Sequence, residues 1–262
     1  MRRMAIGIEY DGSPWHGWQK QPDGKTVQNR LEQAIERFTG ENITLIGAGR
    51  TDSGVHAIEQ VAHLDTTVHR DAFSWVRGVN SFLDHSIALR WACEVPGDFH
   101  ARNSALARRY RYLLYNNPVR SPLSRKRAGW FFRPLEVEAM QDAARFLLGE
   151  HDFSAFRASE CQAATPVKTM QDISIERQAD LLVFEFEASA FLQHMVRNIV
   201  GSLIYVGKGE HDPSWIKTLL EGKDRNRAAP TFMPDGLYLV KVRYDAKWNL
   251  PQSTPGHHLA GR

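Results

Sequence analysis

Hydrophobic residues recur at two different spacings along the first part of the chain. A spacing of two residues indicates half-buried strands, and a spacing of three to four residues indicates amphipathic helices. These patterns predict, in chain order, a strand at 4–10, a helix at 27–38, strands at 43–48 and 59–65, a helix at 72–83 and a strand at 87–95. Thr26 is the expected N-cap of the first helix, and Gly40 is its expected stop.

The second part of the chain repeats this order of elements without repeating the residues. The predicted elements are a strand at 109–116, a helix at 137–148, strands at 170–176 and 181–189, a helix at 192–203, a short extra helix at 215–220 and a strand at 237–243. The order βαββαβ is that of a ferredoxin-like unit, in which an antiparallel sheet carries both helices on one face.

We therefore predict an α+β fold of two ferredoxin-like halves. The halves are expected to form one continuous antiparallel sheet with helices packed on one face and a basic cleft between the halves. Residues 1–104 are the predicted N-terminal domain, residues 105–250 the predicted C-terminal domain, and residues 251–262 a predicted flexible tail.

The composition is that of a globular protein with a buried core, since 42% of the 262 residues are hydrophobic. No apolar run approaches the roughly 18 residues that a membrane span needs, so no membrane partner is expected. The N-terminus leads directly into a predicted strand, which argues against a signal peptide. Cys93 and Cys161 have neither metal nor redox spacing, so a reducing, cytoplasmic setting is the simplest expectation.

The placement of the basic residues indicates an anionic partner more clearly than the net charge of +3 does. Clusters occur at 108–112, 120–127 and 223–227, and the first is interleaved with tyrosines. One such cluster is usually a solvated face. Three clusters favour RNA, because guanidinium groups pair with phosphates and aromatic rings stack on exposed bases.

The segment with the densest polar chemistry is 47–57, between two predicted strands. Its Asp52 is a candidate nucleophile, because the glycines around it allow close approach of a ligand and Arg50 could hold the carboxylate ionised or bind a phosphate. An Asp in such a segment is also a common turn former. Asp52-Ser53-Gly54 also resembles the Asp-Ser/Thr-Gly signature of aspartic proteases, whose second carboxylate a dimer would have to supply.

A second candidate is Arg197, which the helical pattern places on one stripe with His194 and Gly201. It is either a surface arginine or a half-buried one beside Asp52, where it would hold that carboxylate ionised.

A third candidate is Tyr110, which alternates with Arg109 and Arg111 on its predicted strand. Its ring is either a core residue or a stacking surface in a basic cleft. The eleven histidines show no convincing ligand spacing, and the chain has neither a Walker loop nor a GxGxxG motif. We therefore expect no metal and no cofactor.

Several motifs together resemble those of one family along nearly the whole chain. They are Ile8-Glu9-Tyr10-Asp11-Gly12 followed by Gly17-Trp18-Gln19, then Gly49-Arg50-Thr51-Asp52-Ser53-Gly54-Val55-His56-Ala57, Asp98-Phe99-His100-Ala101-Arg102, Arg108-Arg109-Tyr110-Arg111-Tyr112, His194-Met195-Val196-Arg197-Asn198-Ile199-Val200-Gly201 and Gly236-Leu237-Tyr238-Leu239. In this order they resemble the tRNA pseudouridine synthase I (TruA) family.

This resemblance implies an activity and a partner. The implied reaction is isomerisation of uridine to pseudouridine at positions 38, 39 and 40 of the tRNA anticodon stem-loop, by a homodimer that needs no cofactor. The reaction breaks the N1–C1′ bond, turns the uracil and joins its C5 to C1′. Attack of the carboxylate at C1′ and a glycal intermediate both remain open.

The resemblance also implies roles for single residues. Asp52 is the implied nucleophile and Arg197 its partner, while Tyr110 stacks on the target uracil and is a candidate acceptor for the C5 proton. Arg50 acts in opening the stem and takes the place of the flipped base, and Leu237 is an apolar pocket contact. Arg109 and Arg111 belong to the basic cluster that is expected to bind the substrate.

A non-catalytic RNA-binding protein built from ferredoxin-like units is the alternative from a different class. It shares the three basic clusters. It leaves Asp52 unexplained, because an anion in a phosphate-binding cleft weakens binding.

Overall fold

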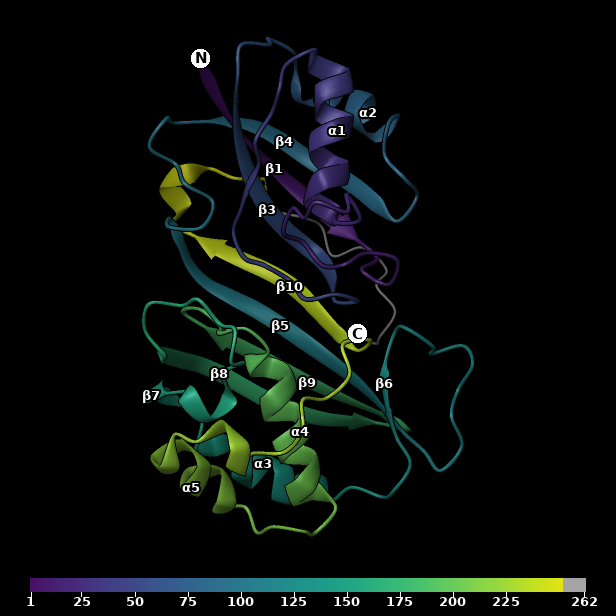
Figure 1. Ribbon diagram of the computed structural model, residues 1–262, viewed down its shortest axis with the longest axis vertical. Coiled ribbons are helices and arrows are strands. Elements are labelled where there is room, and N and C mark those ends of the chain that lie inside the picture. The colour runs from purple at the N-terminus through teal and green to yellow at the C-terminus, as the bar shows by residue number, and fades with distance from the viewer. Residues whose placement is uncertain (252–262) are drawn as a thin grey trace. The chain divides into compact units, whose positions relative to one another are not determined.

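A computed structural model describes residues 1–251 of the chain and divides it into two compact units. Unit 1 contains residues 1–106 and the described residues from Leu239 onward, and unit 2 contains Ala107–Tyr238. The chain passes from one unit to the other within β5 (Ala105–Asn116) and again within β10 (Leu237–Tyr244). Figure 1 shows both strands. The predicted tail lies outside the described residues except for Pro251.

Unit 1 contains the strand and helix order that the sequence predicts. Its elements are β1 (Arg2–Tyr10), α1 (Val27–Thr39), β2 (Ile46–Gly47), β3 (His56–Thr66), α2 (Ala72–Asn80), β4 (Ile87–Val95), the larger part of β10 and the 3₁₀ turn η3 (Ala246–Trp248). The strands lie in the order β4-β1-β3-β10, and β2 pairs with β3. β1 is antiparallel to both β3 and β4.

The core of unit 1 lies between these strands and the two helices. Ile6 and Ile8 of β1 are fully buried. Phe38 of α1 meets Trp75 of α2 edge to face, with ring centroids 5.2 Å apart. Gly78 makes this approach possible, because a Cβ there would lie 2.1 Å from the Phe38 ring. The two helices therefore pack directly against each other.

The ends of α1 follow the predicted capping chemistry. The Thr26 hydroxyl accepts a hydrogen bond from the Asn29 N–H, which satisfies one of the free donors of the first helical turn. Gly40 ends the helix with a φ of 77°, a left-handed conformation that glycine adopts without a steric penalty.

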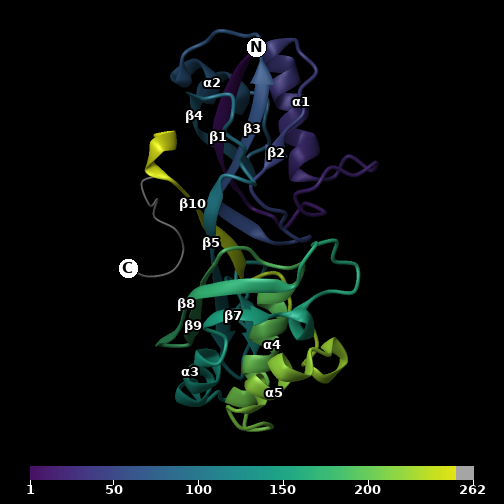
Figure 2. The same cartoon turned by 90° about the vertical axis from the view of Figure 1, so that its left-hand side faces the viewer.

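Unit 2 also combines antiparallel strands with helices. Its elements are the larger part of β5, β6 (Gly129–Phe131), α3 (Val137–Arg145), β7 (Gly149–Asp152), η1 (Ser154–Phe156), β8 (Val167–Gln178), β9 (Leu181–Ala188), α4 (Met195–Gly207), α5 (Trp215–Gly222) and η2 (Arg225–Arg227). The strands lie in the order β5-β9-β8-β7, and only β6, among the pairings recorded for this unit, runs parallel to its neighbour β5. Figure 2 shows α3, α4 and α5 gathered beside these strands.

The predicted α+β class, with mostly antiparallel strands, is confirmed. The domain division differs at one point, because residues 105–250 were predicted to include the last strand. From Leu239 onward β10 belongs to unit 1, where it lies next to β3. Tyr244 fixes the end of β10 there, since its hydroxyl donates to the Ala101 carbonyl at 2.6 Å. The basic cleft between the halves stays a prediction.

Several element boundaries also differ from the predicted ones. The strand predicted at 43–48 shortens to β2, and the helix predicted at 192–203 begins only at Met195 and continues to Gly207. His194 precedes α4 with a left-handed φ of 62°, so it is not part of the helical stripe. β6 and β7 have three and four residues, too few to show a period. Within residues 1–251, no helix is long and apolar enough to cross a membrane.

Candidate functional site

Asp52 lies in unit 1, in the turn that connects β2 to β3. We call residues 47–57 the Asp52 segment. Its first residues are fixed by the adjoining strand: the Ala48 N–H donates to the Val61 carbonyl at 2.8 Å, and the buried Gln60 amide donates to the Gly49 carbonyl at 2.8 Å. The turn closes where the Val55 N–H donates to the Asp52 carbonyl at 3.1 Å. Asp52 itself is half-buried, and Arg50 is exposed.

The loop between β1 and α1 packs its backbone against the Asp52 segment. The Trp18 N–H donates to the Thr51 carbonyl at 3.0 Å, and the Ser53 hydroxyl donates to the Trp15 carbonyl at 3.2 Å. Gly17 has a φ of 87°, and a Cβ there would lie 2.7 Å from the Thr51 carbonyl oxygen. Glycine is therefore required where the two backbones meet.

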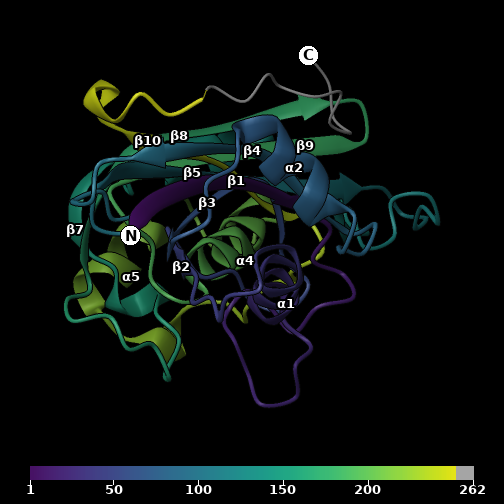
Figure 3. The same cartoon turned by 90° about the horizontal axis from the view of Figure 1, so that it is seen from above.

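Trp18 of this loop is buried in the contact. Trp18 is only 2% exposed. Its indole lies over Gly47, where an added Cβ would come within 2.7 Å of the ring nitrogen. Trp18 therefore packs against Gly47, the first residue of the Asp52 segment. The loop between β1 and α1 projects away from the strands, as Figure 3 shows.

Two polar side chains of the segment bond to residues outside it. The Thr51 hydroxyl shares a hydrogen bond of 2.8 Å with the Tyr10 hydroxyl at the end of β1. His56 is 1% exposed, and its Nδ1 accepts from the Gly12 N–H at 3.1 Å. An Asp11 carboxylate oxygen lies 3.2 Å from the same Nδ1. Among the candidates in the segment, Asp52 and Arg50 remain for chemistry.

Tyr110 lies in unit 2 on β5, opposite Phe186 of β9. The residue is 7% exposed. Its ring meets that of Phe191 edge to face, with the two ring centroids 4.9 Å apart. Tyr112, two residues further along, is fully buried, and its hydroxyl donates to the Met233 carbonyl at 2.8 Å. Burial raises the pKa of Tyr112 well above its ordinary value. Tyr112 is therefore a structural residue.

Arg109 and Arg111 pair with acidic residues on the neighbouring strand. Arg109 Nε lies 3.1 Å from a Glu187 carboxylate oxygen, and Arg111 Nε lies 2.5 Å from a Glu185 carboxylate oxygen. The register places each pair directly opposite across β5 and β9. Both guanidinium groups thus have a role in joining the strands, and their contact with RNA stays a prediction.

Arg197 lies in the first turn of α4 and is half-buried. Its Nε donates to the Phe232 carbonyl at 2.8 Å, and the Phe232 N–H donates back to the Arg197 carbonyl at 3.3 Å. Gly201, one turn further on, would bring a Cβ within 2.5 Å of the Pro230 carbonyl oxygen. The segment 229–232 therefore runs in contact with α4 and orients the guanidinium group of Arg197.

Leu237 follows this segment as the first residue of β10 and is 5% exposed. Its N–H donates to the Pro234 carbonyl at 2.8 Å. The carbonyl of the preceding Gly236 accepts from the Leu113 N–H at 2.9 Å. Leu237 is therefore held in place at the start of β10, and its contact with a base stays a prediction.

Two residues that sequence reasoning missed brace the same segment. Asn198 is fully buried: its amide nitrogen donates to the Phe156 carbonyl at 2.8 Å, and its oxygen accepts from Arg225 and Thr231. Arg225 also donates to the Ala229 carbonyl at 2.9 Å. Burial lowers the pKa of this arginine. Asn198 belongs to the motif at 194–201 and Arg225 to the basic cluster at 223–227. Nothing in the sequence indicates that their side chains meet.

The structure thus groups the candidates by unit. Asp52 and Arg50 belong to unit 1, whereas Tyr110, Arg197 and Leu237 belong to unit 2. The pairing of Asp52 with Arg197 stays a prediction. Within residues 1–251, no group of three or more His, Cys, Asp or Glu side chains is arranged to hold a metal ion.

Comparison with known proteins assigns the family. A sequence model of the family described as tRNA pseudouridine synthase matches residues 6–103 and 143–245. The chain is 62% identical over 256 residues to "tRNA pseudouridine synthase A" of Herminiimonas arsenicoxydans, covering 96% of this chain and 93% of that protein. It is 60% identical over 257 residues to the protein of the same name from Janthinobacterium sp. (strain Marseille), covering 96% and 95%.

A solved structure entitled "Crystal Structure of a Cbf5-Nop10-Gar1 Complex" is similar at 11% identity with a TM-score of 0.35, over 77% of this chain and 45% of that one. So low a TM-score carries no weight beside the sequence matches. These sequence matches extend over both units and include the Asp52 segment and α4. The chain therefore belongs to the tRNA pseudouridine synthase family of isomerases.

Proposed function

We propose that this protein isomerises uridine to pseudouridine at positions 38, 39 and 40 of the tRNA anticodon stem-loop, with Asp52 as the nucleophile. The observation that carries the proposal is the construction of the Asp52 segment. Backbone and side-chain hydrogen bonds fix the residues on both sides of Asp52, while the carboxylate itself belongs to a half-buried residue in a turn. A rigidly held carboxylate is what attack at a sugar carbon requires.

The reaction needs no external reactant. The bond from N1 to C1′ breaks, the uracil turns, and a bond from C5 to C1′ forms while the C5 proton leaves and N1 gains one. The atoms of substrate and product are the same. A uridine in a stem must first leave the base stack, which costs a few kcal/mol that contacts elsewhere on the tRNA have to offset.

The residues of unit 2 supply the remaining roles in this proposal. Tyr110 stacks on the extruded uracil and is the candidate acceptor for the C5 proton, and Leu237 contacts the same base through apolar packing. Arg197, oriented by the Phe232 carbonyl, pairs with the ionised Asp52. Arg50, exposed in unit 1, takes the place of the flipped base in the stem.

Arg109 and Arg111 have a smaller part, because Glu187 and Glu185 already neutralise them. Their mutation should affect strand pairing first and tRNA affinity second. The proposed assembly is a homodimer that acts in the cytoplasm, and sedimentation equilibrium with and without tRNA tests the dimer.

Pseudouridine mapping on tRNA transcripts tests the proposed positions. The wild-type protein is incubated with an unmodified transcript that has uridines at positions 38, 39 and 40 and with matched transcripts in which one of these is cytidine. We expect modification at each uridine and at no other position of the transcript. Binding of the transcripts without any pseudouridine would favour the non-catalytic alternative, and modification elsewhere would refute the anticodon assignment.

A further inference from the structure

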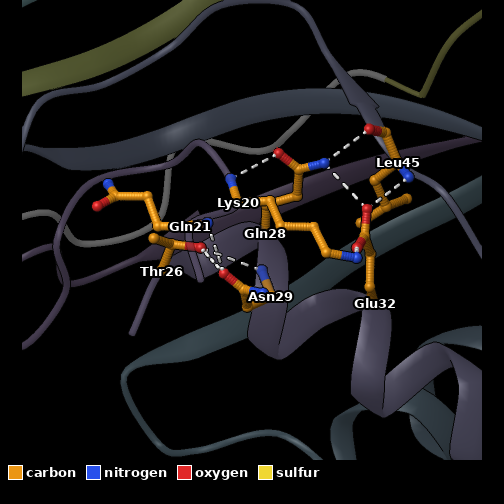
Figure 4. Close-up of polar contacts among 7 residues, drawn as sticks. All are labelled: Lys20, Gln21, Thr26, Gln28, Asn29, Glu32 and Leu45. Carbon is orange, nitrogen blue, oxygen red and sulfur yellow. Dashed lines mark hydrogen bonds and ion pairs between the residues drawn. The ribbon is translucent and has the colours of Figure 1, made fainter. Parts of the chain in front are cut away.

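A buried polar cluster on α1 touches both chain segments that shape the Asp52 turn. Gln28 and Glu32 lie one helical turn apart on α1, and each is only 5% exposed. Figure 4 shows their side chains directed at Lys20 on one side and at Leu45 on the other. Polar groups buried this deeply need specific partners, because an unpaired one is costly.

The first contact of the cluster is with the strand that leads into the Asp52 segment. Leu45 is 2% exposed and directly precedes β2. Its N–H donates to Glu32 Oε1 at 3.0 Å, and its carbonyl accepts from Gln28 Nε2 at 3.0 Å. Gln28 Nε2 also donates to Glu32 Oε1 at 2.9 Å. The two side chains therefore satisfy both backbone groups of Leu45, as a paired strand would.

The second contact is with the loop that packs on the Asp52 segment. The Lys20 N–H donates to Gln28 Oε1 at 3.1 Å, and Lys20 Nζ donates to Glu32 Oε2 at 2.8 Å. The hydrogen bond to the Glu32 carboxylate raises the pKa of Lys20. The Gln28 N–H donates to the Trp18 carbonyl at 3.0 Å. Lys20 thus connects the loop to α1 two residues after Trp18, whose N–H binds the Thr51 carbonyl.

The cluster links these two contacts through a short path. On one side it fixes Leu45, two residues before the Asp52 segment begins at Gly47. On the other it fixes residues 18–20, and Trp18 in turn binds Thr51, the residue before Asp52. The nucleophile is therefore held from its entering strand and from its covering loop by one set of side chains.

We infer that Gln28, Glu32 and Lys20 are positioning residues that set the place of the Asp52 carboxylate. The inference rests on the proposed function in taking Asp52 as the reacting group. A misplacement of about 1 Å at a reacting group is enough to reduce a rate by about a hundredfold. Loosening the cluster should therefore slow the chemical step more than it weakens tRNA binding.

The test uses Glu32→Gln, which keeps the size of the side chain and an oxygen that accepts from Leu45 and Gln28. It removes the charge that binds Lys20, whose own side chain is exposed enough to be solvated. We expect a single-turnover isomerisation rate at least about tenfold below wild type, with tRNA affinity within about twofold and unchanged melting. Lys20→Arg, which keeps the cation, should stay near the wild-type rate.

Two further variants separate positioning from stability. Lys20→Met leaves the buried Glu32 charge unpaired and should lower both stability and rate, whereas Lys20→Met with Glu32→Gln should regain stability and still react slowly. Asn80→Ala is the matched control. Asn80 makes two hydrogen bonds with the backbone of Leu89, at 2.9 and 2.7 Å, but these join α2 to β4. Its loss should lower stability without lowering the rate of the chemical step.

Hydrogen exchange of the free protein tests the same inference without any activity. Peptides covering residues 47–55 should exchange at least about fivefold faster in Glu32→Gln than in wild type, and peptides from β4 should not change. Equal exchange and a wild-type rate in Glu32→Gln would overturn the inference. A wild-type protein that forms no pseudouridine would refute the proposed function instead, and the exchange result would still decide whether the cluster holds the segment.

Discussion

Replacing Gly201 by alanine should disturb the contact between α4 and the segment that orients Arg197. A Cβ at Gly201 would lie 2.5 Å from the Pro230 carbonyl oxygen, whereas ordinary contacts begin at 3.4 Å. The segment would have to move by about 0.9 Å, which is the difference between these two distances. Forced repacking of this kind costs about 1–3 kcal/mol. Alanine also favours a helix over glycine by about 1 kcal/mol, so the net loss should be up to about 2 kcal/mol.

Gly222→Ala is the matched control for this prediction. Gly222 ends α5, and a Cβ there would meet only the Arg227 side chain, at an ordinary 3.6 Å. The variant should therefore be at least as stable as wild type. The difference in unfolding free energy between the two variants, measured by urea denaturation followed by circular dichroism, isolates the Pro230 contact because both gain helix propensity.

The Gly201 variant also has a functional consequence. Phe232 lies two residues after Pro230, and its carbonyl accepts from Arg197 Nε. A shifted segment should turn the guanidinium group and slow isomerisation of tRNA at an unchanged affinity. If Gly201→Ala proves as stable and as active as Gly222→Ala, the close approach of this segment to α4 is not what the structure indicates.

Three further predictions concern the side chains of Tyr112 and His63 and the basic clusters. Tyr112→Phe should lower the unfolding free energy by about 1–2 kcal/mol, because the Met233 carbonyl loses its donor; an unchanged urea midpoint would contradict this. Burial lowers the pKa of His63 from 6.5 to about 4, so the unfolded chain takes up this proton first and stability should fall by about 3 kcal/mol as the pH drops from 6.5 to 4. His63→Gln, whose oxygen can still accept from the Ala101 N–H, should reduce that loss, and an identical pH profile would speak against it. Affinity for tRNA should decrease steeply with salt concentration, and a flat response would exclude the basic clusters as phosphate contacts.

Periodicity predicted the long elements well, and the reason is visible in their burial. α1 buries apolar side chains at helical spacing, so this spacing reflects the core that the helix faces. In β1 the large apolar side chains alternate along the strand, and the small Ala5 and Gly7 between them are buried as well. β7, with the sequence Gly-Glu-His-Asp, buries almost nothing and depends on backbone pairing with β8. Such a strand leaves no hydrophobic pattern to detect.

The sequence pattern could not predict that β10 lies next to β3, for a related reason. The alternation of β10 shows that it is a strand, but its position beside β3 depends on backbone hydrogen bonds that any strand of that length offers. From Leu239 onward the strand groups with unit 1, which its alternation alone does not indicate.

In the candidate site, too, the sequence shows which polar residues are present but not which contacts they make. The dense polar chemistry of the Asp52 segment was visible, but the Thr51 side chain bonds to the Tyr10 hydroxyl and His56 to the Gly12 backbone. Gln28 and Glu32 fit the helical pattern of α1 as polar residues, and nothing in their spacing indicates that both are buried. Their importance depends on Leu45, whose need for partners appears only once the chain is folded.

Tritium release from tRNA labelled at C5 of uridine tests the role of Asp52 most directly. Asp52→Asn keeps the shape of the side chain and removes the charge, so we predict that the release rate falls by about a thousandfold or more while tRNA binding is retained. Asp84→Asn, at an exposed aspartate paired with Arg30, should release tritium at the wild-type rate. Turnover by Asp52→Asn at a rate near that of Asp84→Asn would contradict the assignment of Asp52 as the nucleophile.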